Sequence, residues 1–138
     1  MEGNTRVLFC GPIDQPLNSG RYMIAGMQQL GYEVIGYDYR SHASCEQELM
    51  EIVESRKPGY VLTLKGEKLP ARLIEHFRRK GCTTILWLTT SVLEDWMLPF
   101  AKVHDFVVTN TEDIKIFFRR NGVKNTRWIH QGFAPEFF

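Results

Sequence analysis

The chain has few cysteines and no surplus of either charge. Its three cysteines, Cys10, Cys45 and Cys82, lie far apart and form no CxxC pair, so neither a disulfide framework nor a zinc site is indicated. With 17 basic and 16 acidic residues the formal net charge is +1, which argues against nonspecific nucleic-acid binding. No apolar run approaches the roughly 18 residues that a membrane-spanning helix needs. The N-terminal residues lack the basic and apolar regions of a signal peptide, and we expect a cytoplasmic protein.

Several short motifs that carry chemistry are also missing. The sequence contains no DxD, no P-loop and no GxSxG, and its four histidines have no metal-ligand spacing, so no metal site and no resident cofactor is expected. The GxGxxG of dinucleotide-binding folds is missing too, because Gly11 and Gly20 lie nine residues apart with no third glycine in register. Asp38 stands where such folds place a ribose-binding acid, but we interpret it as a solvated turn residue. A nicotinamide-dependent oxidoreductase is therefore disfavoured.

What the sequence does contain is a regular alternation of short apolar runs and amphipathic segments. Its 138 residues, 43% of them hydrophobic, suffice for one core, and we expect a single domain over residues 1–138. The apolar runs predict strands at Arg6–Cys10, Tyr32–Tyr37, Tyr60–Leu64, Thr84–Leu88, Phe106–Thr109 and Thr126–His130. The helical periodicity predicts helices at Gly20–Leu30, Glu46–Lys57, Pro70–Gly81, Val92–Phe100 and Thr111–Gly122, with Ser19 and Thr111 as N-caps.

Strands that alternate with helices predict repeated βαβ units. Parallel strands need crossover connections, these are right-handed, and the helices then cover both faces of one sheet. The predicted fold is therefore α/β, with a doubly wound, mainly parallel six-stranded sheet in a Rossmann-like three-layer αβα sandwich. Periodicity does not determine the order of the strands, so that order stays open.

Polar residues that follow the predicted strands are the candidate ligand contacts, because ligands of such sheets bind beyond the carboxyl ends of the strands. Unpaired N–H groups at the start of a helix suit a phosphate, a carboxylate or a sugar hydroxyl. We expect substrate contacts from Gly11, Asn18, Ser19, Gly20, Lys65, Gly66, Thr89, Thr90, Ser91 and Asn110. Simpler alternatives stay open, since Ser19 and Ser91 can cap helices and residues 65–68 can form a charged surface turn.

Two residues are candidates for a catalytic base. Glu67, in the loop after the third predicted strand, could act as a general base, with Lys65 beside it as an anion contact. His130, at the end of the last predicted strand, is the one histidine that we keep as a site candidate. Position alone identifies neither of them as the base, so the catalytic residue stays unassigned.

A set of short segments shares its order and spacing with a known family. These segments are Arg6–Phe9, Gly31–Val34, Lys57–Leu62, Ile85–Leu88, His104–Asn110 and Gly122–Val123. The closing residues 131–138 contain the pattern G-x-x-P-x-x-F. In this order the segments resemble the N-terminal half of a GT-B glycosyltransferase, most closely the CgeB-like (spore maturation protein) group.

The resemblance implies two Rossmann-like domains that face each other across a cleft, with this chain as the acceptor-side domain and residues 131–138 as the start of the interdomain linker. It implies metal-independent transfer of a sugar from a nucleotide-sugar donor to a sugar or other hydroxyl-bearing acceptor. A second domain, in cis or in trans, would hold most of the donor, and without it the chain is expected to be inactive. Relatives often carry an acidic residue shortly after the fourth strand, where this chain has Thr89, Thr90 and Ser91.

A different class of function also fits these residues. In that class the chain is a stand-alone Rossmann-like module that binds a sugar, a nucleotide or a protein partner without turnover. The two classes differ in a measurable way, because only the first transfers a sugar when a second domain is present.

Overall fold

The structure, a computed structural model, describes residues 4–16 and 18–129. It contains a six-stranded sheet of order β2-β1-β3-β4-β5-β6 in which every neighbouring pair of strands is parallel. The strands are β1 (Arg6–Cys10), β2 (Glu33–Tyr37), β3 (Tyr60–Leu64), β4 (Thr83–Leu88), β5 (Phe106–Thr109) and β6 (Thr126–Trp128). The helices are α1 (Ser19–Gln29), the 3-10 helix η1 (Tyr39–Ser41), α2 (Cys45–Arg56), α3 (Ala71–Arg79), α4 (Met97–Lys102) and α5 (Glu112–Arg120). The predicted doubly wound α/β fold is confirmed, whereas His130 and the expected linker at 131–138 lie outside the described residues.

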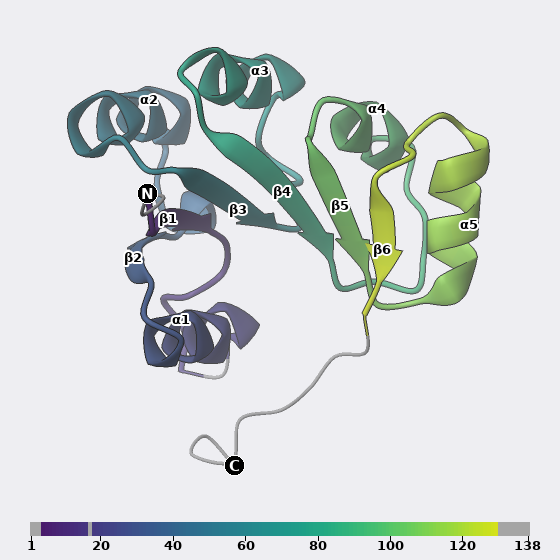
Figure 1. Cartoon of the computed structure of the whole chain (residues 1–138), viewed down its shortest axis with the longest axis horizontal. Coiled ribbons are helices and arrows are strands. Elements are labelled where there is room, and N and C mark those ends of the chain that lie inside the picture. Colours follow the sequence, from purple (N-terminus) through teal and green to yellow (C-terminus); the bar gives the residue numbers. More distant parts are fainter. Residues whose placement is uncertain (1–3, 17, 130–138) are drawn as a thin grey trace.

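The helices are divided unequally between the two faces of the sheet (Figure 1). On one face α1 packs alone, and its Met27 lies against a cluster that contains Val7 and Phe9 of β1. On the other face α2, α3, α4 and α5 cover a larger cluster that includes Leu86 of β4 and Phe118 of α5. The hydrophobic core is therefore larger on the face that carries four helices than on the face that carries α1.

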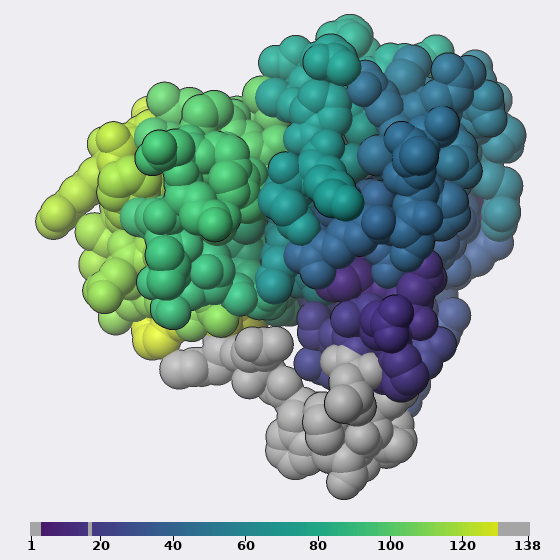
Figure 2. Space-filling model, turned by 180° about the vertical axis from the view of Figure 1, so that it is seen from behind, coloured from purple at the N-terminus to yellow at the C-terminus, as the bar shows by residue number. Residues whose placement is uncertain are grey.

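The handedness of the connections explains this division. The connection from β1 to β2 runs in one direction along the sheet, and every later connection runs in the other. Because parallel crossovers are right-handed, the helix of the first connection lies on one face and the later helices lie on the opposite face. Figure 2 shows the molecule from behind, and the colours along the chain pass across it from purple and blue through teal to green and yellow.

Part of the face that carries α1 has no helix over it in the described part of the chain. Along β4 the burial alternates, because Leu86 on the four-helix face is fully buried while Ile85 and Trp87 on the α1 face are half-buried. Phe106 of β5, in register with Ile85, is 45% exposed. Parallel sheets normally have both faces covered. The structure thus leaves an apolar strip over β4 and β5, next to α1.

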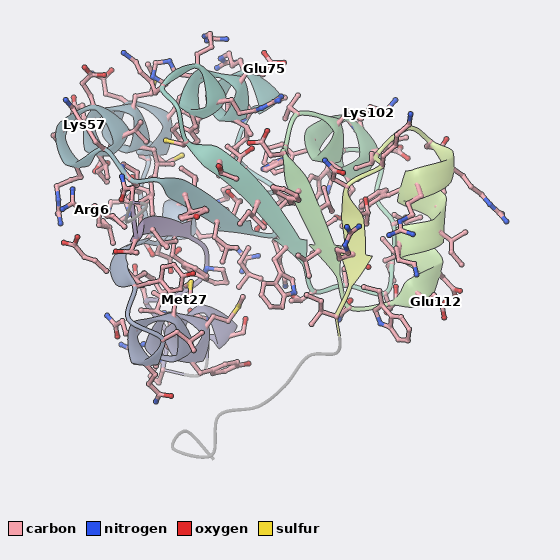
Figure 3. All side chains as sticks on the ribbon, in the orientation of Figure 1. Arg6, Met27, Lys57, Glu75, Lys102 and Glu112 are labelled. Atoms are coloured by element: carbon pink, nitrogen blue, oxygen red, sulfur yellow. The ribbon has the colours of Figure 1, made fainter. Side chains whose placement is uncertain are left out.

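A cavity of about 260 Å³ marks where α1 stops covering the sheet. Its lining residues are Val7, Met27, Tyr32, Tyr60, Leu62 and Ile85. Met27, labelled in Figure 3, reaches this cavity from α1. The lining is almost entirely apolar, so the cavity continues the apolar strip rather than forming a polar binding site.

The helix after β4 is shorter and begins later than the predicted Val92–Phe100. It spans Met97–Lys102, and residues 89–96 form a loop. Proline lacks an N–H and clashes with the preceding turn, so an α-helix tolerates it only in the first turn. Pro99 is the third residue of α4, which meets this requirement, whereas the predicted helix placed it near the end.

One of the two expected helix caps is confirmed and the other is wrong. Thr111 Oγ1 accepts a hydrogen bond from the N–H of Ile114 at 3.4 Å, as a cap of α5 should. Ser19 is not a cap but the first residue of α1. The residue before it, Asn18, does not cap α1 with its side chain either, since its Oδ1 accepts the N–H of Gln15 at 2.9 Å.

All three cysteines are free thiols, and two of them belong to the core. Cys10 is fully buried, and burial raises the pKa of its thiol far above the usual value. Burial raises the pKa of the Cys82 thiol as well. A protonated, buried thiol is a poor nucleophile, so Cys10 serves packing, as the sequence indicated.

The uneven cover of the sheet predicts unequal costs for two phenylalanine truncations. Phe118→Ala should lower the free energy of unfolding by about 3–5 kcal/mol, because it opens a cavity in the closed core. Phe106→Ala should cost roughly 1 kcal/mol, because this side chain is 45% exposed. Urea denaturation of both variants measures the difference. Equal losses would show that Phe106 is covered in solution.

The buried His104 predicts a loss of stability in mild acid. Burial lowers the pKa of its imidazole to about 4, although the carbonyl of Phe100 accepts a bond from Nδ1 at 2.9 Å. The unfolded chain, with an ordinary pKa near 6.5, binds the proton first, so this stability is present above that value and is lost as the pH falls toward 4. At pH 5 the loss should be about 2 kcal/mol.

Urea denaturation of the native chain and of His104→Gln at pH 7.5 and pH 5.0 measures this contribution. The difference between the two pH values should be smaller for the variant, because carboxylates titrate in both proteins and only the native chain has this imidazole. An identical pH dependence in the two proteins would contradict the assignment.

Candidate functional site

The direction of winding reverses between β1 and β3, and this identifies the edge where a ligand is expected. The two strands are neighbours, but the helix after β1 lies on one face and the helix after β3 on the other. The loops that follow the two strands therefore turn toward opposite faces of the sheet and leave a crevice between them. Ligands of open α/β sheets commonly bind at such a switch point. Thr89, Thr90 and Ser91 follow β4, which lies one strand further along the sheet than this reversal.

Asp38, the residue after β2, is a buried anchor for the loop after β1. Its Oδ2 accepts the N–H groups of Ile13 and Asp14 at 2.9 Å each, and its Oδ1 accepts the N–H of Arg40 at 3.0 Å. Burial by itself raises the pKa of this carboxyl, but the three N–H donors outweigh burial and hold the pKa below its usual value. The interpretation of Asp38 as a solvated turn residue is wrong. Both of its oxygens are engaged by the chain itself.

Glu67 is a second carboxylate with partners in the protein. It accepts a hydrogen bond from the hydroxyl of Tyr39 at 2.5 Å and pairs with Arg40 Nε at 2.7 Å. The Tyr39 hydroxyl in turn accepts the N–H of Gly66 at 2.9 Å. Burial raises the pKa of Glu67, yet the bonds from Arg40 and Tyr39 prevail and lower the pKa below its ordinary value. Glu67 is therefore ionised and holds the loop after β3 to the loop after β2.

A cavity of about 320 Å³ lies beside this network at the carboxyl edge of the sheet. Its lining comes from the loops that follow β2, β3 and β4 and from the start of α4. The residues are Arg40, Lys65, Glu67, Leu88, Thr89, Thr90, Val92, Glu94, Trp96 and Met97. The set combines hydroxyl, cationic and anionic groups with an indole, which suits a small ligand that carries several polar groups.

Three of the predicted substrate contacts line this cavity, together with the candidate base Glu67. They are Lys65, Thr89 and Thr90, which come from two different loops. The hydroxyl of Thr90 is part of its own turn, because Oγ1 accepts the N–H of Val92 at 3.1 Å. The side chain of Lys65 makes no ion pair within 4.0 Å in the part of the chain that the structure describes.

The other predicted contacts are not among the residues that line the cavity. They are Gly11, Asn18, Ser19, Gly20, Gly66, Ser91 and Asn110. Gly20 serves close packing, because a Cβ there would lie 2.6 Å from the carbonyl oxygen of Pro12. Asn110 has a buried Oδ1 that finds no hydrogen-bond partner among the described residues. The substrate roles of these residues stay predictions, as does the catalytic role considered for His130.

Sequence reasoning missed Arg40, Glu94 and Trp96 as cavity residues. Glu94 and Trp96 were assigned to the predicted helix Val92–Phe100, whereas they lie in the loop before α4, where Trp96 Nε1 donates to Glu94 Oε2 at 2.6 Å. Pro99 is the signal that could have found them, because it requires the helix to begin close before it. Arg40 lies in the loop after the second predicted strand, at the edge where ligands bind, but only the fold brings it to Glu67.

A larger hollow of about 770 Å³ lies at the opposite edge, at the amino ends of β4 and β5. Its lining includes Arg78, Arg79, Thr83 and Asp105. Arg78 is already paired with Asp105 at 3.1 Å. Because ligands of open α/β sheets bind at the carboxyl edge, the smaller cavity is the better candidate.

Residues 4–16 and 18–129 contain neither a cluster of metal-binding side chains nor a membrane-spanning helix. Within these ranges no group of three histidine, cysteine, aspartate or glutamate side chains could hold a metal ion. No helix in the same ranges is long and apolar enough to cross a membrane.

Comparison with known proteins shows the fold but not a family. No family model matches the chain, and no curated protein matches it either. Among solved structures it is similar to a LacI family transcriptional regulator, CCPA from Weissella paramesenteroides, determined with bound glucose. The TM-score is 0.50 at 18% identity, over 80% of this chain and 38% of that one. At this identity the likeness concerns the fold alone, and the chain spans little more than a third of the neighbour's length.

The turn that positions Lys65 and Glu67 predicts a cost for filling Gly66. Gly66 has a φ of +84°, and a Cβ there would lie 2.6 Å from Phe100 Cε2 and 2.8 Å from Thr63 Cγ2. Gly66→Ala should lower the free energy of unfolding by about 2–5 kcal/mol. The left-handed backbone contributes roughly 1–2 kcal/mol of this loss, and the overlap of the new Cβ with its neighbours contributes roughly 1–3 kcal/mol.

Gly81→Ala is the matched control. Gly81 has a φ of +89°, but a Cβ there would meet nothing within 4 Å, so only the backbone cost of about 1–2 kcal/mol applies. Chemical denaturation of both variants measures the difference. If the two losses are equal, the turn after β3 is not packed as tightly as the structure indicates.

Proposed function

We propose that this chain is the acceptor-binding half of a metal-independent GT-B glycosyltransferase. Its cavity at the carboxyl edge holds a hydroxyl-bearing acceptor, and a second domain, in cis or in trans, binds the nucleotide-sugar donor. The observation that carries the proposal is the lining of that cavity, in which Lys65, Thr89 and Trp96 stand together at the edge where open α/β sheets bind ligands. The order and spacing of the family-like segments agree with it.

The lining suits a sugar in its chemistry. A sugar offers hydroxyl groups that both donate and accept hydrogen bonds, and its C–H faces are apolar. Thr89 supplies a hydroxyl for which the structure shows no bond within the described residues, and Trp96 supplies an aromatic body with a polar tip. The LacI family neighbour of the same fold was determined with bound glucose, which agrees with a sugar as the class of ligand.

The transfer itself needs groups that this half does not supply alone. A base must take the proton of the acceptor hydroxyl, which then attacks the anomeric carbon while the nucleoside diphosphate leaves. Glu67 is a weak candidate for that base, because its ion pair and hydrogen bonds lower its pKa. Stabilisation of the departing diphosphate falls to the second domain, so the isolated chain is expected to bind without turnover.

The uncovered part of the sheet also favours a second domain. Ile85 and Trp87 are half-buried and Phe106 is 45% exposed, so the described helices leave this apolar strip incompletely covered. A parallel sheet with one half-open face is poorly buried by itself. A second domain that packs against this face would bury the apolar strip.

One observation favours a second candidate function, a binding module without catalysis. Both carboxylates that line the cavity are engaged, Glu67 by Arg40 and Tyr39, and Glu94 by the indole N–H of Trp96. A cavity whose carboxylates are both occupied can recognise a sugar without activating it. The two candidates share the ligand and differ only in turnover.

A pair of isosteric variants tests whether the cavity binds a sugar. Thr89→Val removes a hydroxyl from the cavity and should weaken binding of glucose or another neutral hexose about fivefold, the equivalent of one hydrogen bond. Thr83→Val, at the other end of the same strand, should leave binding unchanged. Titrations followed by NMR measure the dissociation constants. Equal effects of the two variants would show that the sugar does not bind in this cavity.

A second measurement separates the transferase from the binding module. The longest natural gene product that contains this chain is screened against nucleotide sugars by thermal shift and donor hydrolysis. A response to a donor, with transfer or hydrolysis, supports the transferase. Sugar binding without a response to any donor favours the binding module, and no binding of either contradicts both.

A further inference from the structure

The backbone at Lys65 has an uncommon conformation. Only two of the described residues other than glycine have a positive φ, namely Lys65 at +71° and Lys57 at +48°. The left-handed region is unfavourable for every residue with a Cβ, so such a residue needs a reason. Residues of this kind gather at functional sites when no local structure requires them.

The two lysines differ in their reasons. Lys57 ends α2, and a left-handed residue is the usual way to end a helix. Lys65 ends no helix but follows β3 directly, at the switch point of the sheet. Its N–H donates to the carbonyl of Trp87 at 2.9 Å, a bond that glycine would make with less strain. The fold therefore needs this backbone geometry but not a lysine side chain.

The surroundings of Lys65 indicate what its side chain does. It lines the cavity beside Arg40 and Glu67, which neutralise each other at 2.7 Å. The other carboxylate of the lining, Glu94, accepts the indole N–H of Trp96 at 2.6 Å. Among the described residues Lys65 is thus the cation of the cavity that has no ion pair within 4.0 Å.

From this arrangement we infer that Lys65 recognises an anionic group and that the ligand of the cavity is a sugar bearing a phosphate or a carboxylate. The inference rests on the proposed function and adds the charge of the ligand to it. An ammonium on a flexible stem is a compact point charge, which suits either anion. Charge-assisted hydrogen bonds are about twice as strong as neutral ones, so such a ligand should be preferred over a neutral sugar.

NMR titrations of the chain with glucose, glucose 6-phosphate, glucuronate and uridine diphosphate test the inference. The amide signals of Gly66, Thr89 and Thr90 report on the cavity. At least one of the two anionic sugars should bind about tenfold more tightly than glucose. Comparing the titration with glucose 6-phosphate and the titration with glucuronate identifies whether the cavity binds a phosphate or a carboxylate.

Variants of the two left-handed lysines provide matched controls. Lys65→Gly should abolish the tenfold preference and leave the midpoint of urea denaturation unchanged or higher, because glycine adopts this φ without strain. Lys57→Gly makes the same chemical change at the amino edge of the sheet, near the end of α2 (Figure 3), and should keep the preference. Lys65→Arg retains the charge and should keep most of the preference.

The possible outcomes separate the inference from the proposed function. If glucose and the anionic sugars bind equally, or if Lys65→Gly keeps the preference, the inference fails while a sugar-binding cavity stands. If no sugar binds, both fail. If uridine diphosphate alone binds and depends on Lys65, the lysine contacts the diphosphate of the donor, and the inference of an anionic sugar is overturned.

Discussion

The parallel pairing of β1 with both β2 and β3 is the constraint on which the rest of the structure depends. It makes the chain wind in one direction once and in the opposite direction thereafter. Right-handed crossovers then place α1 on one face and the later helices on the other. The same pairing brings the carboxyl ends of all strands to one edge. The candidate cavity and the open apolar strip are both consequences of this pairing.

Charged groups at that edge divide into those that shape the site and those left for a ligand. Asp38 holds the loop after β1 through three backbone N–H groups, and Glu67 joins the loops after β2 and β3 through Arg40 and Tyr39. Carboxylates whose oxygens have partners within the protein keep loops in place, whether buried as Asp38 or more exposed as Glu67. Because these carboxylates already have partners in the protein, they are poorly placed to bind a ligand or to act as a base. The polar side chains left to contact a ligand are those of Lys65 and Thr89.

The fold alone does not identify a function, because many unrelated activities share open α/β sheets. The LacI family regulator illustrates this, since its likeness to the chain extends only to the fold. The lining of one cavity therefore supports the proposal of sugar chemistry, and the apolar strip around Ile85 and Phe106 supports the proposal of a second domain. Each rests on its own residues.

The sequence by itself determined which segments form strands and helices, because periodicity and turn residues act locally. It predicted β1, β3 and β5 to the residue and Thr111 as a cap. The predicted start of α4 was wrong, although Pro99 carries a local signal for it. Only the tertiary structure decided the strand order, the burial of Asp38 and the pairing of Arg40 with Glu67. These depend on contacts between residues far apart in the chain, about which local patterns carry no information.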